Sequence, residues 1–249
     1  MMVRMNLLAV ALVYAGLLAA FVAAVSAIRP PRKRPFRALA AGVIAFAVGL
    51  LLPQGETRVA VPQTRLDQFS PVYQFNEAHS VRIHASRDQV YAAIRGVTPD
   101  EIAFFRALTW IRRFGKPGPQ SILIAPRQAP LLETAIRTGF LPLAEDPGKE
   151  IVIAAVMGRP TPDWARAKRS PEQFKSLQTP NVAKIAMNFR VEERNAGECE
   201  LFTETRVFAT NASGRLAFAG YWRVIYPGSA LIRRMWLRAI RLRAEAMAA

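Results

Sequence analysis

The residues whose types suit chemistry are few, and the most suggestive pair is Glu204 with Arg206. The two lie two positions apart in an alternating segment, so they share one face of a strand with Phe202 and Phe208. On a face that lines a cavity, these charges would bind or polarise a polar head group. On a wet face they would form a structural ion pair of the kind that strands commonly carry, and we favour this second interpretation.

Other reactive side chains show no catalytic spacing. His79 and His84 are five positions apart around one strand, which puts them on opposite faces, so we interpret them as surface histidines. Cys199, the single cysteine, has no basic neighbour in sequence and is expected to be a small buried thiol. The sequence has no Gly-rich phosphate loop, HExxH or GxSxG motif. It therefore predicts no catalytic residue, no metal site and no cofactor, and it favours a protein that is not an enzyme.

Charge is concentrated at the two ends of the chain. The 249 residues carry 34 Lys and Arg against 18 Asp and Glu, a formal net charge of +16. Residues 1–57 hold six basic side chains and one acidic one, while residues 215–249 hold seven arginines and only Glu245. Because the centre is nearly balanced and no nucleic-acid-binding motif accompanies the charge, we expect no nucleic-acid partner.

Two apolar stretches, 7–28 and 36–52, precede everything else and are separated by a basic turn. The first is long enough to cross ~30 Å of hydrocarbon as a helix, and the second is near the lower limit. We predict a transmembrane hairpin over residues 1–57, and we therefore expect the lipid bilayer to be a partner of the protein. The alternative is a cleaved signal peptide, since Val25-Ser26-Ala27 mimics a small-residue cleavage site.

The charges around these stretches predict the topology. The turn between them carries most of the basic residues, so the positive-inside rule places it in the cytoplasm and both chain ends outside. We therefore expect an inner (plasma) membrane protein with two spans and a periplasmic or extracytoplasmic domain. A cytoplasmic domain is the alternative, and it holds if the second stretch does not cross.

Beyond the hairpin, the pattern predicts a polar extended linker over 58–72 and one folded domain over 73–249. Lys184 and Asn188 fall opposite the apolar face of their strand and are expected to face solvent. Strands are predicted over 77–85, 140–145, 150–157, 182–193 and 199–210. Helices are predicted from the caps at Ser86 and Thr98, the second running to Arg113, then over 131–138 and 171–177, and in two terminal segments separated at Pro227.

The opening of this domain, His79-Ser-Val-Arg-Ile-His-Ala-Ser-Arg-Asp-Gln-Val-Tyr-Ala-Ala-Ile94, is a strand, a small polar cap and a Val-aromatic helix. With the element order that follows, it is similar to the helix-grip fold of the START-like, or SRPBCC, superfamily. The resemblance implies an α+β fold, with an antiparallel sheet wrapped on a long C-terminal helix. It also implies a cavity for hydrophobic molecules. Some members are aromatic-ring cyclases and others are lipid carriers. The sequence departs from the pattern at 115–138, at 159–181 and at Pro227.

The leading functional hypothesis is a membrane-anchored helix-grip domain that binds a hydrophobic, lipid-like molecule near the bilayer without covalent chemistry. One alternative is cyclase- or hydrolase-like chemistry in the same cavity, and another is a structural or assembly role without a ligand. The residues predicted to bind the ligand are Phe202, Glu204, Arg206, Phe208 and Trp222. The residues predicted to touch the membrane surface from the terminal helix are Arg233, Arg234, Arg238 and Arg241.

Overall fold

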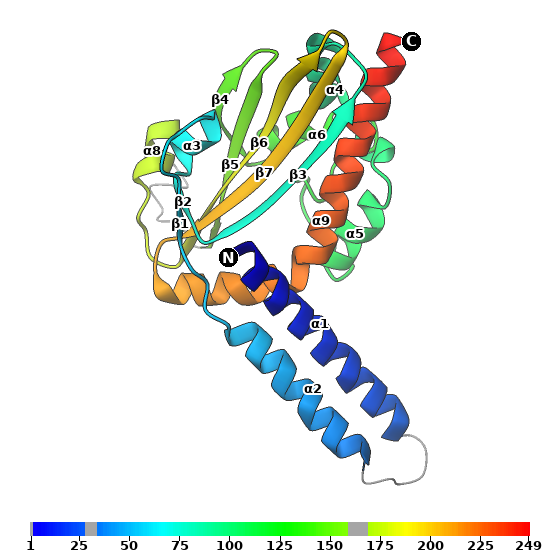
Figure 1. Cartoon of the computed structure of the whole chain (residues 1–249), viewed down its shortest axis with the longest axis vertical. Coiled ribbons are helices and arrows are strands. Elements are labelled where there is room, and N and C mark those ends of the chain that lie inside the picture. The colour runs from blue at the N-terminus through cyan, green and yellow to red at the C-terminus, as the bar shows by residue number, and fades with distance from the viewer. Residues whose placement is uncertain (1, 28–33, 159–168) are drawn as a thin grey trace.

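The computed structural model describes residues 2–27, 34–158 and 169–249, and it combines a helical hairpin with an α+β domain (Figure 1). Helices α1 (Met2–Ala27) and α2 (Arg34–Leu51) lie side by side and project away from the domain. Most of the basic turn between them, and residues 159–168 of the predicted connection, lie outside the described residues.

Glycines allow α1 and α2 to approach closely. A methyl group on Gly16 would stand 2.6 Å from the carbonyl oxygen of Gly42, and one on Gly49 would stand 2.9 Å from the backbone nitrogen of Val13. Such small-residue contacts are typical of helix pairs in membranes. Among the described helices, only α1, over Leu7–Ser26, is long and apolar enough to cross a membrane, and a signal sequence would look the same. The predicted second span, at Phe36–Leu51, is a shorter apolar helix.

A five-stranded antiparallel sheet forms the centre of the domain, in the order β3-β7-β6-β5-β4. These strands confirm the predicted ones, and the register Phe75↔Val207 and Ile185↔Val207 places three apolar side chains together. We call the face that carries them the front face, and the other the back face. The strands are β3 (Phe75–Ile83), β4 (Leu141–Asp146), β5 (Glu150–Gly158), β6 (Val182–Asn195) and β7 (Glu198–Ala209).

The helices between β3 and β4 match the prediction except at one point. Helices α4 (Arg87–Gly96) and α6 (Leu131–Arg137) form as expected. The helix expected from Thr98 to Arg113 is divided into η1 (Pro99–Glu101) and α5 (Phe105–Arg112). Thr98 and Glu101 do form the predicted capping box, but Phe104 has a φ of 62°, which no α-helix continues through. Helix α8 (Pro171–Ser176) confirms the predicted helical turn.

The terminal helix α9 (Ala212–Ala248) is one helix with Pro227 inside it, rather than two separate segments. It bends sharply, so that its first part runs across the end of the domain beside the hairpin and its second part runs along the sheet (Figure 1). Proline lacks the N–H for an intrahelical bond and clashes with the preceding turn, which accounts for a bend in a helix that otherwise continues.

Segment 58–72 is not the extended tether that its polar composition predicted. Strands β1 (Thr57–Arg58) and β2 (Val72–Tyr73) pair with each other and flank α3 (Arg65–Phe69). Thr64 and Asp67 form a capping box on α3, and Leu66 is fully buried among back-face residues. A one-turn helix with a single core residue is too short to show an apolar period, so sequence patterning missed it.

Candidate functional site

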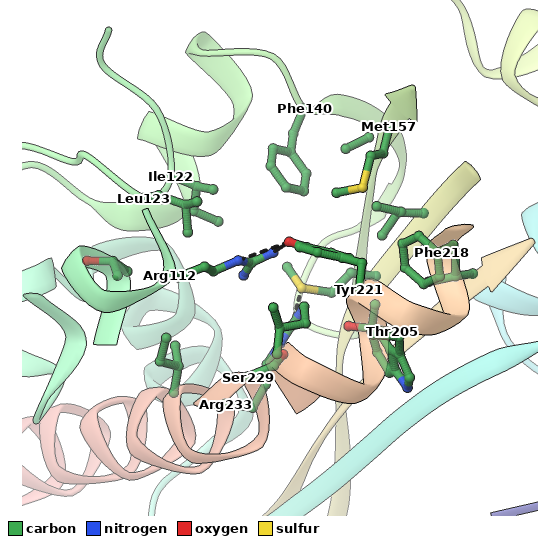
Figure 2. A pocket seen from close by; sticks show the side chains of 18 of the residues that line it. Arg112, Ile122, Leu123, Phe140, Met157, Thr205, Phe218, Tyr221, Ser229 and Arg233 are labelled. Atoms are coloured by element: carbon green, nitrogen blue, oxygen red, sulfur yellow. Dashed lines mark hydrogen bonds between the residues drawn. The ribbon is translucent and has the colours of Figure 1, made fainter. Parts of the chain in front are cut away.

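A cavity of about 310 Å³ lies between the front face of the sheet, α9, and α5 with the loop that follows it (Figure 2). Its wall is mostly apolar, because β5, β6 and β7 turn alternate side chains toward it while α9 supplies aromatic rings. The apolar lining includes Phe140, Ala155, Ile185, Val207, Phe218 and Trp236.

The polar groups of the cavity come from two sides (Figure 2). Arg112 of α5 donates from Nε to the hydroxyl of Tyr221 at 3.1 Å, and its Nη2 donates to the same oxygen. Ser229 and Arg233 reach the cavity from α9, and Thr205 reaches it from β7. No Asp or Glu occurs among the described residues that line it. The cavity is therefore an apolar chamber with two cationic side chains.

Arg233 borders the cavity and is largely covered by protein, yet its partners are weak ones. Its Nη1 contacts the sulfur of Met187 and lies 3.5 Å from the hydroxyl of Thr203. Burial lowers the pKa of Arg233 to about 10, an effect that nearby Glu77 opposes and Arg112 reinforces. Within the described part of the chain, Arg233 joins no ion pair. A guanidinium in this setting keeps unused capacity to bind an anion.

Glu77 lies next to the cavity without lining it. It is 4% exposed, accepts a hydrogen bond from the hydroxyl of Ser229 at 2.9 Å, and lies 3.0 Å from Nε2 of His79. The expectation of surface histidines is therefore correct for exposed His84 and wrong for His79, whose side chain is largely covered. This carboxylate offsets part of the positive charge around Arg233.

Of the five residues predicted to bind a ligand, only Trp222 lines this cavity. Glu204 and Arg206 form the favoured structural ion pair, at 2.9 Å, on the back face. Phe202 and Phe208 share that face because side chains alternate along β7, which leaves Thr205 and Val207 for the front. The alternation of apolar residues along β6 could have indicated the front face, because Ile185 and Met187 lie on its apolar side. The strand register pairs these two residues with Val207 and Thr205.

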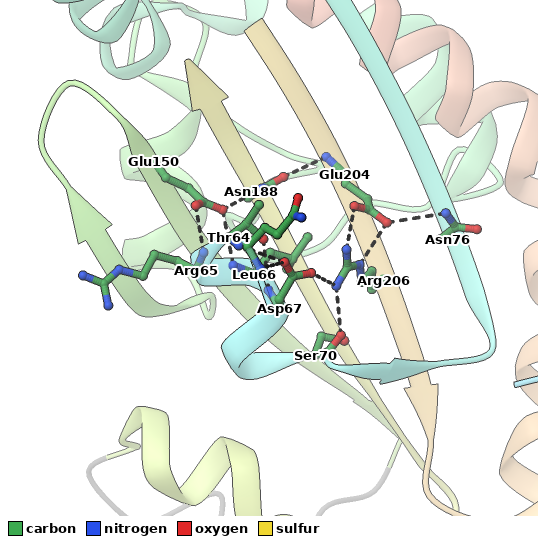
Figure 3. A network of polar contacts seen from close by, with 11 residues as sticks. Thr64, Arg65, Leu66, Asp67, Ser70, Asn76, Glu150, Asn188, Glu204 and Arg206 are labelled. Carbon is green, nitrogen blue, oxygen red and sulfur yellow. Dashed lines mark hydrogen bonds and ion pairs between the residues drawn. The ribbon is translucent and has the colours of Figure 1, made fainter. Parts of the chain in front are cut away.

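The back face carries a buried polar network that fastens α3 to the sheet (Figure 3). Arg206 donates to Asp67 at 2.7 Å and to the carbonyl of Ser70 at 3.1 Å, in addition to Glu204. Glu150 accepts from the backbone nitrogen of Arg65 at 2.9 Å and from Asn188 at 2.7 Å. Arg206 therefore meets opposite charges and Glu150 meets hydrogen-bond donors, which is the pattern of a structural network.

The prediction that Lys184 and Asn188 face solvent is wrong. They are 9% and 3% exposed, because α3 and α8 cover the back face of the sheet. Lys184 donates to the carbonyl of Lys175 at 2.8 Å, and Asn188 joins the network at Glu150. Cys199 is free and fully buried, as predicted, and burial raises the pKa of its thiol.

The arginines predicted to meet the membrane divide into two groups. Arg233 borders the cavity and is partly covered, which disfavours the contact with the membrane surface predicted for it. Arg234 and Arg238 are exposed, and Arg241 lies 3.9 Å from Glu245. The part of α9 that carries them leads away from the hairpin (Figure 1).

Sequence analysis missed an exposed apolar surface on α5. Trp110 is 58% exposed, and Phe114, which lies just beyond the end of α5, is 86% exposed. Phe104 and Ile111 are exposed beside them, whereas Phe105 and Thr109 face inward. The division of the predicted helix at Phe104 changes which residues of α5 point to the core.

Comparisons with known proteins add little to this geometry. No protein-family model matches the chain, and no curated protein matches it. A hypothetical protein of known structure from Helicobacter pylori, jhp0584, is 12% identical with a TM-score of 0.33, over 75% of this chain and 97% of that one. The di-domain ARO/CYC BexL from the BE-7585A biosynthetic pathway is 17% identical with a TM-score of 0.28, over 70% of this chain and 47% of that one.

TM-scores this low carry no argument about function. The class is defined by the architecture itself, an α+β domain whose five-stranded antiparallel sheet and long C-terminal helix fit the helix-grip arrangement. Three or more metal-binding side chains do not gather anywhere among the described residues.

Proposed function

We propose that this protein is a membrane-anchored helix-grip domain that binds a hydrophobic, lipid-like molecule between its sheet and α9, without covalent chemistry. The observation that carries the proposal is the cavity of about 310 Å³ with its apolar wall and few polar groups. Its volume is at the lower end of the range of small-molecule sites, which favours a single chain or a compact ring system over a two-chain lipid.

The side chains around the cavity favour binding over catalysis. Ser229 gives its hydrogen bond to Glu77, and no histidine or cysteine occurs among the described lining residues that could activate or replace it as a nucleophile. Arg112 and Tyr221 are joined by a hydrogen bond. This arrangement favours a ligand-binding protein over the cyclase- or hydrolase-like alternative.

Contacts between the hairpin and α9 support a position close to the bilayer. Arg223, fully buried, donates to the carbonyls of Leu50 and Leu52 at the end of α2. Tyr14 of α1 donates to the carbonyl of Val224 at 2.6 Å. We propose that α2 crosses the membrane together with α1, and that the first part of α9 lies at the membrane surface.

In this proposal the domain faces the periplasm or the cell exterior. Fusions of alkaline phosphatase and of a cytoplasmic fluorophore to the C-terminus test the topology. Phosphatase activity is the expected result, and fluorescence alone would place the domain in the cytoplasm and reduce the number of crossings to one or change their direction.

The exposed side chains of α5 supply a route between bilayer and cavity. Trp110 and Phe114 are exposed on the surface of the protein, whereas Phe105 and Arg112 of α5 line the cavity. Arg112 also links α5 to Tyr221, in the part of α9 that contacts the hairpin. We propose that this surface, rather than Arg234, Arg238 and Arg241, makes the main contact with lipid.

Native mass spectrometry of the full chain purified in a neutral detergent tests ligand binding. The wild-type protein is expected to carry a co-purifying lipid-like molecule, and Ala155→Trp is expected to lose it because Ala155 lines the cavity. Ala78→Trp is the matched control, since Ala78 is exposed on β3 and does not line the cavity. A ligand retained in Ala155→Trp, or absent from all three folded proteins, would contradict the proposal.

A further inference from the structure

The proposed binding site has an uneven balance of charge. Two guanidinium groups, those of Arg112 and Arg233, border the cavity, and the described lining contains no acidic side chain. Both arginines reach toward the middle of the cavity from opposite elements, α5 and α9 (Figure 2). A purely hydrocarbon ligand would bring no counter-charge to either guanidinium inside the cavity.

Arg233 has the most to gain from an anion. A largely covered guanidinium without an ion-pair partner is costly, and the present contacts of Arg233 are a thioether and a hydroxyl. Glu77 is the acidic group close enough to influence it, but both carboxylate oxygens of Glu77 are already engaged, by Ser229 and His79. Arg112 is held by a neutral phenol, which an anion would replace with a stronger, charge-assisted contact.

We infer that the ligand is an amphipathic anion whose single carboxylate or phosphate group is held between Arg233 and Arg112, with its apolar body along β5, β6 and β7. This inference rests on the proposed ligand-binding function and specifies its substrate class. The guanidinium fork matches the geometry of either anion, so the chemistry common to carboxylate and phosphate is what the site recognises. The lining residues that contact the apolar body include Ala155, Ile185 and Val207.

The experiment uses the full chain in a neutral detergent, with the uncharged fluorophore N-phenyl-1-naphthylamine as the probe of the cavity. Hexadecanoate, hexadecyl phosphate and hexadecanol then compete with the probe, because they share one chain and differ only in the head group. We expect at least one anion to displace the probe at a concentration about tenfold or more below that of the alcohol. A preference for one of the two anions identifies the head group.

Variants assign the preference to its residues. Arg233→Met is expected to remove the advantage of the anion and to leave displacement by hexadecanol unchanged. Arg234→Met is the matched control, since Arg234 is the exposed neighbour on the same helix, and it should behave as wild type. If Arg233→Met does not fold, Arg112→Met gives the same readout from the other side of the cavity.

The outcomes separate the two proposals. Equal displacement by all three competitors, or an anion preference that survives Arg233→Met and Arg112→Met, overturns the inference while the hydrophobic cavity keeps its function. Failure of the fluorophore to bind wild-type protein, together with an absence of bound ligand in the mass spectrum, overturns the proposed function itself.

Discussion

Each face of the sheet packs against an arginine that the protein largely covers, and the two arginines have opposite kinds of partners. On the back face, Arg206 meets the carboxylates of Asp67 and Glu204 and the carbonyl of Ser70. On the front face, Arg233 meets a thioether and a hydroxyl. Arg206 is paired with acidic side chains of the protein itself, so its role is structural. Arg233 has no such pair, so it is suited to bind an anionic ligand.

The difference follows from what covers each face. Helix α3 lies on the back face and brings Asp67 within 2.7 Å of Arg206, so the polar groups of strand and helix satisfy each other. On the front, α9 bends away at Pro227 and α5 supplies the outer wall, which leaves a cavity rather than a packed interface. The front face therefore borders a cavity, whereas the back face is closed by α3 and its polar network.

The largest expected effect is on stability, and it should separate the two arginines. Arg206→Met leaves Asp67 and Glu204 buried or half-buried without their counter-ion, and we expect a loss of about 3–5 kcal/mol. Arg233→Met removes an unpaired charge, so the free energy of unfolding should stay within about 1 kcal/mol of wild type or increase. Urea titration of tryptophan fluorescence measures both. Equal losses in the two variants would erase the proposed distinction.

A second effect concerns acid. Burial raises the pKa of Asp67, but hydrogen bonds from Gln63, Thr64 and Arg206 outweigh it and hold that pKa below the usual 3.8. The carboxylate therefore adds stability that is complete above about pH 4 and is lost as pH falls through the lower, folded-state pKa. Asp67→Asn should cost about 2–3 kcal/mol at pH 7 and make the protein less sensitive to acid.

Thermal unfolding between pH 2 and pH 7 checks this expectation. Asp88→Asn serves as the control, since Asp88 is an exposed residue in the first turn of α4. An unchanged acid response in Asp67→Asn would mean that the network of α3 does not depend on this charge.

A smaller effect is expected at alkaline pH. Burial lowers the pKa of Lys184 to about 8 from its usual 10.5, so between these values the unfolded chain binds more protons than the folded one. Stability should rise as pH increases through that window, and Lys184→Met should remove the rise and stabilise the protein at pH 7 by about 1–2 kcal/mol. Lys175→Met, at a more exposed lysine, is the control. A rise that persists in Lys184→Met would assign it to another group.

Local patterns were sufficient for most of the fold. The capping box at Ser86 predicted the start of α4, and alternation along 182–193 and 199–210 predicted strands β6 and β7. Such patterns determine local structure within a few residues of where they occur, so they can be interpreted without knowing the rest of the fold. Short turns pair β4 with β5 and β6 with β7, whereas the pairing of β5 with β6 spans the connection that contains α8, and β3 pairs with β7 from the other end of the domain.

The site was harder to predict because it depends on what covers each face. Glu204 and Thr205 are equally plausible candidates in an alternating strand until α9 and α3 are placed on opposite sides. Segment 58–72 looked like a linker because the polar residues it buries, such as Asp67, find partners 80 or more positions away, as Arg65 does at Glu150. Arg233 looked like a surface residue because it belongs to the arginine-rich terminal helix together with Arg234 and Arg238.

Photocrosslinking tests the central claim, that the front face holds the ligand and the back face is structural. The full chain is reconstituted in vesicles that contain a fatty acid bearing a diazirine on its chain, irradiated, digested and mapped by mass spectrometry. We predict crosslinks at front-face and α5 positions such as Ile185, Val207 and Phe105, and their loss in Ala155→Trp. Crosslinks confined to the hairpin, or found at Phe202 and Phe208 on the back face, would contradict the account.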